Sequence, residues 1–134
     1  MTYSLDTNTC IYFLKGTYPS IKARLLARRP DELRIPTMVA AELRFDARRS
    51  ARRAENELRV EEFLAQFEMV PFDEGASQQY AVIRTELEGQ GLPIGPNDLV
   101  IAATVKATGG VLVTHNTREF SRVSGLMIED WVER

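Results

Sequence analysis

Apolar residues fall into two kinds of segment, and these alternate from one end of the chain to the other. Short apolar segments of about three residues predict β-strands. They are Tyr3–Leu5, Leu33–Ile35, Met69–Pro71 and Val111–Val113, with Leu126–Ile128 as a candidate edge strand. Longer segments between them repeat their apolar residues at helical spacing. No internal repeat or long linker interrupts this order, so the sequence predicts one α/β domain over residues 1–134 with a mainly parallel sheet.

Capping and helix-breaking residues give the expected limits of the helices. Asp6-Thr7-Asn8 supplies side chains that can cap the first helix, which ends at Gly16. The later helices are expected at Ser20–Arg29, from a cap at Thr37 to Arg49, in a segment carrying Leu58, Phe63, Leu64 and Phe67, at Ser77–Glu88, and from Asp98, capped by Asn97, to Gly109. Thr114–Phe120 is expected to be a loop or helical turn, and Trp131 to anchor the tail.

The composition is that of a folded protein. Hydrophobic residues make up 44% of the chain and charged residues 27%, ordinary values that indicate neither disorder nor a fibrous chain. The single cysteine, Cys10, cannot form an internal disulfide and suits a reducing cytoplasm. There is no leader pattern, and no apolar stretch approaches the roughly 20 residues that span a bilayer. We therefore expect a cytoplasmic protein that is neither exported nor embedded in a membrane.

Charge is unevenly distributed. A net charge of −2 argues against binding nucleic acid by bulk attraction. Basic residues nevertheless gather in one helical stretch, interleaved with Glu55, Glu57, Glu61 and Glu62. They are Arg44, Arg48, Arg49, Arg52, Arg53 and Arg59. A solvated, ion-paired helix face and a surface facing RNA or a partner are equally good interpretations, and Arg44, Arg48 and Arg49 are the RNA-facing candidates under the second.

Three carboxylates occupy positions that a parallel sheet can bring together. Asp6 directly follows the first strand, Glu42 lies within a helix in Ala-Ala-Glu-Leu, and Asp98 opens another helix in Pro-Asn-Asp-Leu. In parallel α/β sheets the functional groups gather at the carboxyl ends of the strands, where the Thr114–Glu119 segment also begins. Two carboxylates about 4 Å apart repel by roughly 4 kcal/mol at an effective dielectric near 20, so a cation is needed to offset them.

The donor types favour one class of metal. Only oxygen ligands are available, which suits Mg²⁺ or Mn²⁺, and Cys10 and His115 make no zinc pair. A magnesium ion takes one or two carboxylates, several waters and phosphate oxygens. Such an ion activates a water and neutralises the charge that develops in an in-line displacement. The sequence therefore predicts a divalent-metal site that cuts a phosphodiester.

Each of these residues also has a plainer interpretation. Taken singly, Asp6 is a helix cap, Asp98 a favourable charge at a helix N-terminus and Glu42 a surface residue. Thr114 either holds a water or phosphate or ends a strand, and Asn8 either orients Asp6 or closes a turn. His115, without a partner in the sequence, is taken as an ordinary polar loop residue.

Four motifs resemble one known family. They are Asp6-Thr7-Asn8, Glu42 in Ala-Ala-Glu-Leu, Asp98 in Pro-Asn-Asp-Leu-Val-Ile-Ala-Ala, and Val-Thr-His-Asn-Thr-Arg-Glu-Phe at 113–120. Together they look like the PIN-domain ribonucleases, specifically VapC-type toxins of bacterial toxin–antitoxin pairs. The resemblance extends from Leu5 to Trp131, and the order and spacing of the motifs carry it, because no single motif is specific.

The resemblance implies a Rossmann-like three-layer fold with about five short, mainly parallel strands and helices on both faces. It implies Asp6, Glu42 and Asp98 as metal ligands of an Mg²⁺- or Mn²⁺-dependent endoribonuclease, supported by the polar residues Thr7, Asn8 and Thr114. A fourth acidic residue often stands in the family where this chain has Asn116. Either Glu119, one turn further on, serves in its place, or Asn116 ligates through its carbonyl oxygen.

The resemblance also implies partners. Similar members nick initiator tRNA in its anticodon region, which makes tRNA the favoured substrate. A homodimer is implied, as is a VapB-type antitoxin whose tail lies across the acidic pocket and presents an Arg to the carboxylates.

Two other classes of protein fit part of this sequence pattern. A receiver-type phosphoacceptor domain also gathers carboxylates at strand ends, but this sequence lacks an acceptor Asp after a middle strand and a Lys after a late one. A PIN fold that has weakened catalysis and acts as an RNA- or protein-binding regulatory module stays open, because Asn116 replaces an acidic residue.

Overall fold

Five short parallel strands form the centre of the molecule. The computed structural model describes residues 1–133. The strands are β1 (Tyr3–Leu5), β2 (Leu33–Pro36), β3 (Glu68–Val70), β4 (Val111–Val113) and β5 (Met127–Glu129). They are ordered β3-β2-β1-β4-β5, and every neighbouring pair is parallel. The predicted strands are therefore confirmed, including the edge strand near the C-terminus, with β3 and β5 displaced by one residue.

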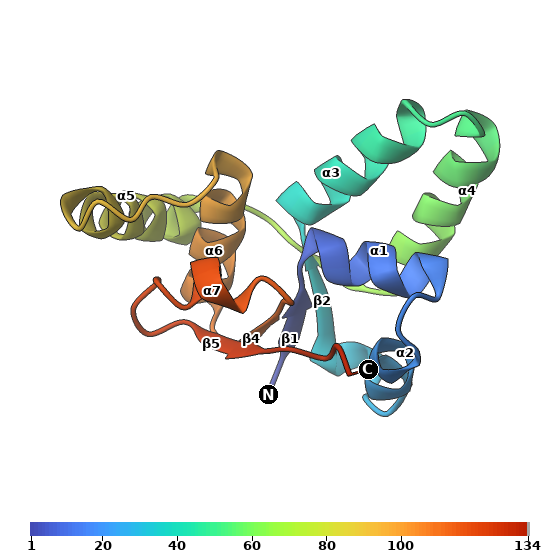
Figure 1. The fold of residues 1–134 in the computed structure, drawn as a ribbon, viewed down its shortest axis with the longest axis horizontal. Helices are drawn as coiled ribbons and strands as arrows, with labels where there is room; N and C mark the ends of the chain where they lie inside the picture. Colours follow the sequence, from blue (N-terminus) through green and yellow to red (C-terminus); the bar gives the residue numbers. More distant parts are fainter. Residues whose placement is uncertain (134) are drawn as a thin grey trace.

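Helices cover the sheet on both sides. They are α1 (Thr7–Lys15), α2 (Pro19–Leu26), α3 (Thr37–Arg48), α4 (Arg53–Leu64), α5 (Glu74–Gly89), α6 (Pro96–Thr108) and the single turn α7 (Thr117–Phe120), with a 3₁₀ turn, η1 (Pro30–Glu32). In Figure 1, α5 and α6 lie on one side of the sheet, and α1 to α4 lie on the other, where α3 and α4 form a projecting hairpin. This arrangement confirms the predicted three-layer α/β fold.

Capping explains the helix limits that the sequence missed. Helix α5 begins three residues earlier than predicted because the Asp73 carboxylate accepts a hydrogen bond from the Ala76 N–H at 3.0 Å. Helix α6 begins at Pro96 with Gly95 as its N-cap, so the prediction that Asn97 caps it was wrong. Proline favours the first helical position, where no N–H is needed.

Proline also sets two other limits. Helix α2 ends at Leu26 rather than Arg29, and Arg29, which precedes Pro30, is extended with ψ 149°. Pro36 is the N-cap of α3, so Thr37 is its first residue and not its cap. Helix α4 ends at Leu64, before Phe67.

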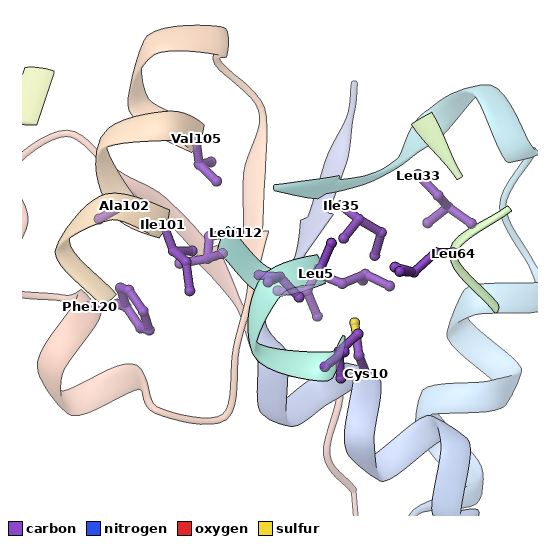
Figure 2. Packing of buried hydrophobic residues seen from close by; sticks show 14 of the residues in the cluster. Leu5, Cys10, Leu33, Ile35, Leu64, Ile101, Ala102, Val105, Leu112 and Phe120 are labelled. Atoms are coloured by element: carbon purple, nitrogen blue, oxygen red, sulfur yellow. The ribbon is translucent and has the colours of Figure 1, made fainter. Parts of the chain in front are cut away.

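The core lies between the sheet and the helices. Leu5, Ile35 and Leu112 are completely buried on neighbouring strands, and Ile101 of α6 and Cys10 of α1 pack towards them (Figure 2). Cys10, a free cysteine, is completely buried in this core. None of the helices within residues 1–133 is long and apolar enough to cross a bilayer.

Trp131 anchors the C-terminal segment, as predicted. Its ring is buried against Tyr3 and the Arg28 guanidinium, and its indole N–H donates to Glu129 Oε1 at 3.0 Å. The Ser20 hydroxyl donates to the Trp131 carbonyl oxygen at 2.7 Å. These contacts fix the tail beside α2 and thereby hold β5 on the sheet.

Candidate active site

The strand order creates a topological switch point at the carboxyl edge of the sheet. From β1 the chain passes to β2 and β3 on one side, and later to β4 and β5 on the other. The connections that leave the carboxyl ends of β1 and β4 therefore diverge, and such a switch point is where open α/β sheets bind ligands. Asp6 follows β1 at this place, and Thr114 follows β4.

The Asp6 side chain is held in place at this switch point. Its side chain is buried, and Oδ1 accepts a hydrogen bond from the Thr9 N–H at 2.9 Å, which confirms its role as the cap of α1. Burial raises the pKa of Asp6 because it disfavours the charged carboxylate; hydrogen bonds from Thr114 and Thr9 offset part of this rise, and the charge of Glu42 adds to it. A nearby cation would therefore stabilise the ionised form.

Glu42 reaches the same place from α3. Its Oε1 accepts a hydrogen bond from the Thr7 hydroxyl at 2.6 Å, and its Oε2 accepts one from the Asn97 amide at 3.3 Å. Thr7 begins α1 and Asn97 lies in the first turn of α6, so one carboxylate joins three helices. The predicted supporting residue Thr7 does contact the acidic group. Asn97 was predicted only as a helix cap. Its position next to the predicted site residue Asp98 was the signal that could have identified it as part of the site.

Asp98 is the residue at which the carboxylates interact most strongly. It lies half-buried in the first turn of α6. Burial first, and then the charges of Glu42, Glu119 and Asp6, raise the pKa of Asp98 to about 6. The field at the N-terminus of a helix favours a carboxylate, so a raised pKa there means that crowding of like charges and loss of solvent prevail.

Asn116 and Glu119 complete the acidic group from β4. The Asn116 amide donates to Glu119 Oε2 at 3.0 Å, and its backbone N–H donates to the Thr114 hydroxyl at 3.0 Å. Asn116 therefore orients Glu119, and Thr114 links Asn116 to Asp6. Asn8 is exposed on α1 and forms no side-chain hydrogen bond to Asp6 within residues 1–133.

The chemistry of the donors fits magnesium or manganese. All four acidic side chains offer oxygen, and the amides and hydroxyls around them are donors that hold carboxylates in place. No three Asp, Glu, His or Cys side chains of residues 1–133 converge closely enough to form the shell of one ion by themselves. Magnesium retains several waters and takes only one or two carboxylates, so a pair from this group satisfies it.

The arginine cluster lies on the α3–α4 hairpin, and its candidates are already paired. Arg44 makes two 2.9 Å hydrogen bonds to Glu61; Arg48 lies 3.9 Å from Glu57; Arg49 lies 3.2 Å from Asp46. This is the arrangement of the ion-paired face, the first of the two interpretations. RNA contact by these arginines stays a prediction.

Arg118 differs from these residues. It is exposed on α7, next to Glu119 in the sequence, and its guanidinium forms neither an ion pair nor a hydrogen bond within the described part of the chain. Arg118 was not among the predicted site residues, although its position directly before Glu119 and soon after a strand was a usable signal.

His115 was also underestimated. Its Nδ1 lies 2.9 Å from Asp130 Oδ2, and its ring lies near those of Tyr12 and Tyr18. The expectation of an ordinary loop residue without a partner was therefore wrong. Its partner is 15 residues away, beyond β5, and only the pairing of β4 with β5 brings the two together.

Comparison with known proteins agrees with this geometry. The family described as "PIN domain" matches residues 3–126. Among curated relatives, Ribonuclease VapC2 of Rickettsia felis is 36% identical, with 98% of both chains covered, and tRNA(fMet)-specific endonuclease VapC of Shigella flexneri is 35% identical with the same coverage. The DNA-bound VapBC structure from Salmonella typhimurium has a TM-score of 0.92 at 36% identity and covers 98% of each chain. VapBC2 from Rickettsia felis, bound to a promoter DNA fragment, has a TM-score of 0.89 at 36% identity and covers 98% of this chain and 99% of that one.

A five-stranded parallel sheet with carboxylates at its switch point and this family match define a PIN-domain protein. Within that class, the chain belongs to the VapC ribonucleases.

Proposed function

We propose that this protein is the toxin of a VapBC-type toxin–antitoxin pair and a metal-dependent endoribonuclease that hydrolyses phosphodiester bonds of tRNA. The observation that carries the proposal is the group of four carboxylates at the switch point of the sheet, Asp6, Glu42, Asp98 and Glu119. Burial first, and then the charges of the other three carboxylates, raise the pKa of Asp98. Groups with strongly raised pKa values in a crevice are typical of sites that await a ligand.

Asp6, Asp98 and Glu42 would supply the one or two carboxylates that an Mg²⁺ or Mn²⁺ ion takes, with water completing its shell. When bound, the ion supplies an activated water and neutralises charge on the phosphate. The protein's part is positioning: Thr9 and Thr114 fix Asp6, Thr7 and Asn97 fix Glu42, and Asn116 fixes Glu119. Because Asp6, Glu42 and Glu119 each accept a hydrogen bond from a neighbouring side chain or backbone N–H, these carboxylates are oriented before the substrate arrives.

Transfer RNA is the proposed substrate, and the initiator tRNA anticodon region the favoured site. Two observations support this. The Shigella flexneri relative is named a tRNA(fMet)-specific endonuclease. Arg118 is exposed, directly precedes Glu119 in α7 and carries a charge that is unpaired within residues 1–133, so it is suited to bind a phosphate of the RNA. Arg44, Arg48 and Arg49 are proposed as a more distant RNA-facing surface.

The proposed antitoxin has a groove available to it. A groove of about 610 Å³ runs between α1 and the α3–α4 hairpin. Ile11, Leu14 and Val60 provide apolar surface, while Lys15 and Arg59 lie among the polar lining residues. An amphipathic helix with apolar anchors and acidic flanks fits such a groove. Leu14→Glu should therefore weaken antitoxin binding, with circular dichroism as the check of folding.

A homodimer is also proposed, and sedimentation of the isolated toxin measures it.

A binding module with weakened catalysis is the second candidate, favoured by Asn116. Against it, Asn116 holds Glu119 in the acidic group, so the number of carboxylates is kept.

Incubation of a total tRNA pool with purified, antitoxin-free protein tests the proposal. Wild-type protein with Mg²⁺ or Mn²⁺ should give discrete fragments, and EDTA or Asp98→Asn should abolish them. A well-folded wild-type protein that cuts no RNA under these conditions would support the binding module instead.

A further inference from the structure

Three aromatic rings meet next to the carboxylates. The Tyr12 and Tyr18 rings pack edge to face with centroids 5.0 Å apart. The His115 ring lies 6.4 Å from the first and 6.5 Å from the second, so each ring neighbours the other two. Tyr12 comes from α1, Tyr18 from the residue before α2, and His115 from the loop after β4. The cluster therefore joins segments that are far apart in the sequence.

The cluster is connected to the acidic group. His115 directly follows Thr114, whose hydroxyl bonds Asp6 and accepts the Asn116 N–H. Tyr12 lies on α1, the helix that Asp6 caps. His115 therefore lies in the chain between Thr114 and Asn116, two residues that contact each other and the acidic group.

His115 is held in place although it is exposed. Its side chain is 39% exposed, yet Nδ1 is fixed by Asp130 Oδ2 at 2.9 Å. Tyr12 and Tyr18 are partly buried against the core, and neither hydroxyl is buried without a partner. A ring that needed only to fill space would be buried; this one is oriented by a carboxylate and presented to solvent.

The charge of the protein makes such a platform useful. The net charge is −2, the acidic group repels phosphates until a cation is bound, and the hairpin arginines are paired. RNA affinity then needs a contribution that does not depend on net charge. Stacking of a base on an aromatic side chain supplies it, at about 1–3 kcal/mol per base.

We propose that Tyr12, Tyr18 and His115 form a platform on which an unpaired nucleobase of the RNA substrate stacks, next to the cleaved bond. The proposal rests on the proposed function, since it concerns the same RNA. Single-stranded loops present splayed bases that proteins read by stacking on aromatic rings and histidine, whereas bases within a duplex are already stacked on one another. The platform therefore selects RNA with an unpaired base beside the scissile phosphate.

The test measures RNA binding without cleavage. All variants are made in the Asp98→Asn background, and binding of a single-stranded RNA oligonucleotide carrying one 2-aminopurine is followed by fluorescence, which falls when that base stacks. His115→Ala should weaken binding about 5- to 100-fold and reduce the quenching. His115→Phe keeps a ring but loses the bond to Asp130, and it should restore most of both. Phe72→Ala, which removes an exposed aromatic ring that is in none of the proposed RNA contacts, is the matched control and should change neither.

The outcomes separate this proposal from the proposed function. Unchanged binding by His115→Ala would overturn the platform. Equal losses in the Ala and Phe variants would overturn it too, because they would assign the effect to the imidazole nitrogens instead of the ring. Cleavage of tRNA by the wild-type protein is measured separately, so an active nuclease whose His115→Ala variant binds normally would refute the platform alone.

Discussion

The α3–α4 hairpin and the carboxyl edge of β1 and β4 both concentrate charged side chains. On the hairpin opposite charges are paired, whereas at the sheet edge like charges are crowded together. On the hairpin, a bidentate contact from Arg44 lowers the pKa of Glu61. At the sheet edge, burial and like charges raise the pKa of Asp98 to about 6. On the hairpin, Arg44, Arg48 and Arg49 are each paired with an acidic residue, whereas the edge holds charge that its neighbours do not neutralise. That difference separates a solvated surface from a site that binds a cation.

The largest expected effect is on catalysis. Asp98→Asn should lower RNA cleavage by more than about 100-fold, because the change removes a ligand charge and not merely its orientation. The matched control is Asp46→Asn, the same substitution on the hairpin, which loses only the exposed pair with Arg49 and should cost less than about 2-fold. Similar activity of the two variants would abolish the distinction between the regions.

A smaller loss is expected from a positioning residue. Thr7→Val removes the hydroxyl that donates to Glu42 and keeps the shape of the side chain. Cleavage should fall about 10- to 100-fold, mainly in kcat, as for other residues that orient a ligand. Thr7→Ser keeps the donor and should restore most of the rate. If Thr7→Val cleaves as fast as wild type, the orientation of Glu42 does not matter.

The crowded edge should also affect stability. The folded-state pKa of Asp98 lies above its ordinary value of 3.8, so ionisation opposes folding as pH rises from about 4 through about 6. In EDTA, the free energy of unfolding of Asp98→Asn should equal that of wild type near pH 4. At pH 7 it should exceed that of wild type by about 1–2 kcal/mol, allowing for solvent screening. Urea unfolding at the two pH values measures this. A constant difference between the proteins would show that Asp98 ionisation is not its cause.

The smallest effects concern RNA affinity. Arg118→Ala should raise KM about 3- to 10-fold by removing one phosphate contact. The double variant Arg48→Glu, Arg49→Glu should weaken RNA binding at 150 mM salt by less than Arg118→Ala does, because both arginines are already paired with acidic residues. Salt titrations of both proteins provide the measurement. Unchanged affinity in the double variant would show that these arginines belong to a solvated, ion-paired helix face and do not contact RNA.

Local chemistry explains how much the sequence could predict. The β-branched strand Val111–Val113 and the cap at Asp6 depend on adjacent residues, and the structure confirms both. Once parallel strands were expected, the neighbourhood of Asp6, Glu42 and Asp98 followed from the position of each one after a strand or on a helix.

The parts that were missed depend on distant side chains. Asn97 bonds Glu42 across 55 residues and His115 meets Asp130 across 15, and neither pair has a sequence signature. The predicted start of α6 was wrong because Asn97 was expected to be its cap, whereas the Asn97 amide donates to Glu42 and Gly95 is the N-cap.

Thermal unfolding with and without Mn²⁺ tests the central claim, that the sheet edge carries uncompensated charge made for a cation. Wild type and Asp98→Asn are compared in EDTA and in excess Mn²⁺ at pH 7. We predict that Asp98→Asn melts higher in EDTA, whereas Mn²⁺ raises the Tm of wild type clearly more than that of the variant. Equal Mn²⁺ shifts in both proteins, or none in wild type, would contradict the claim.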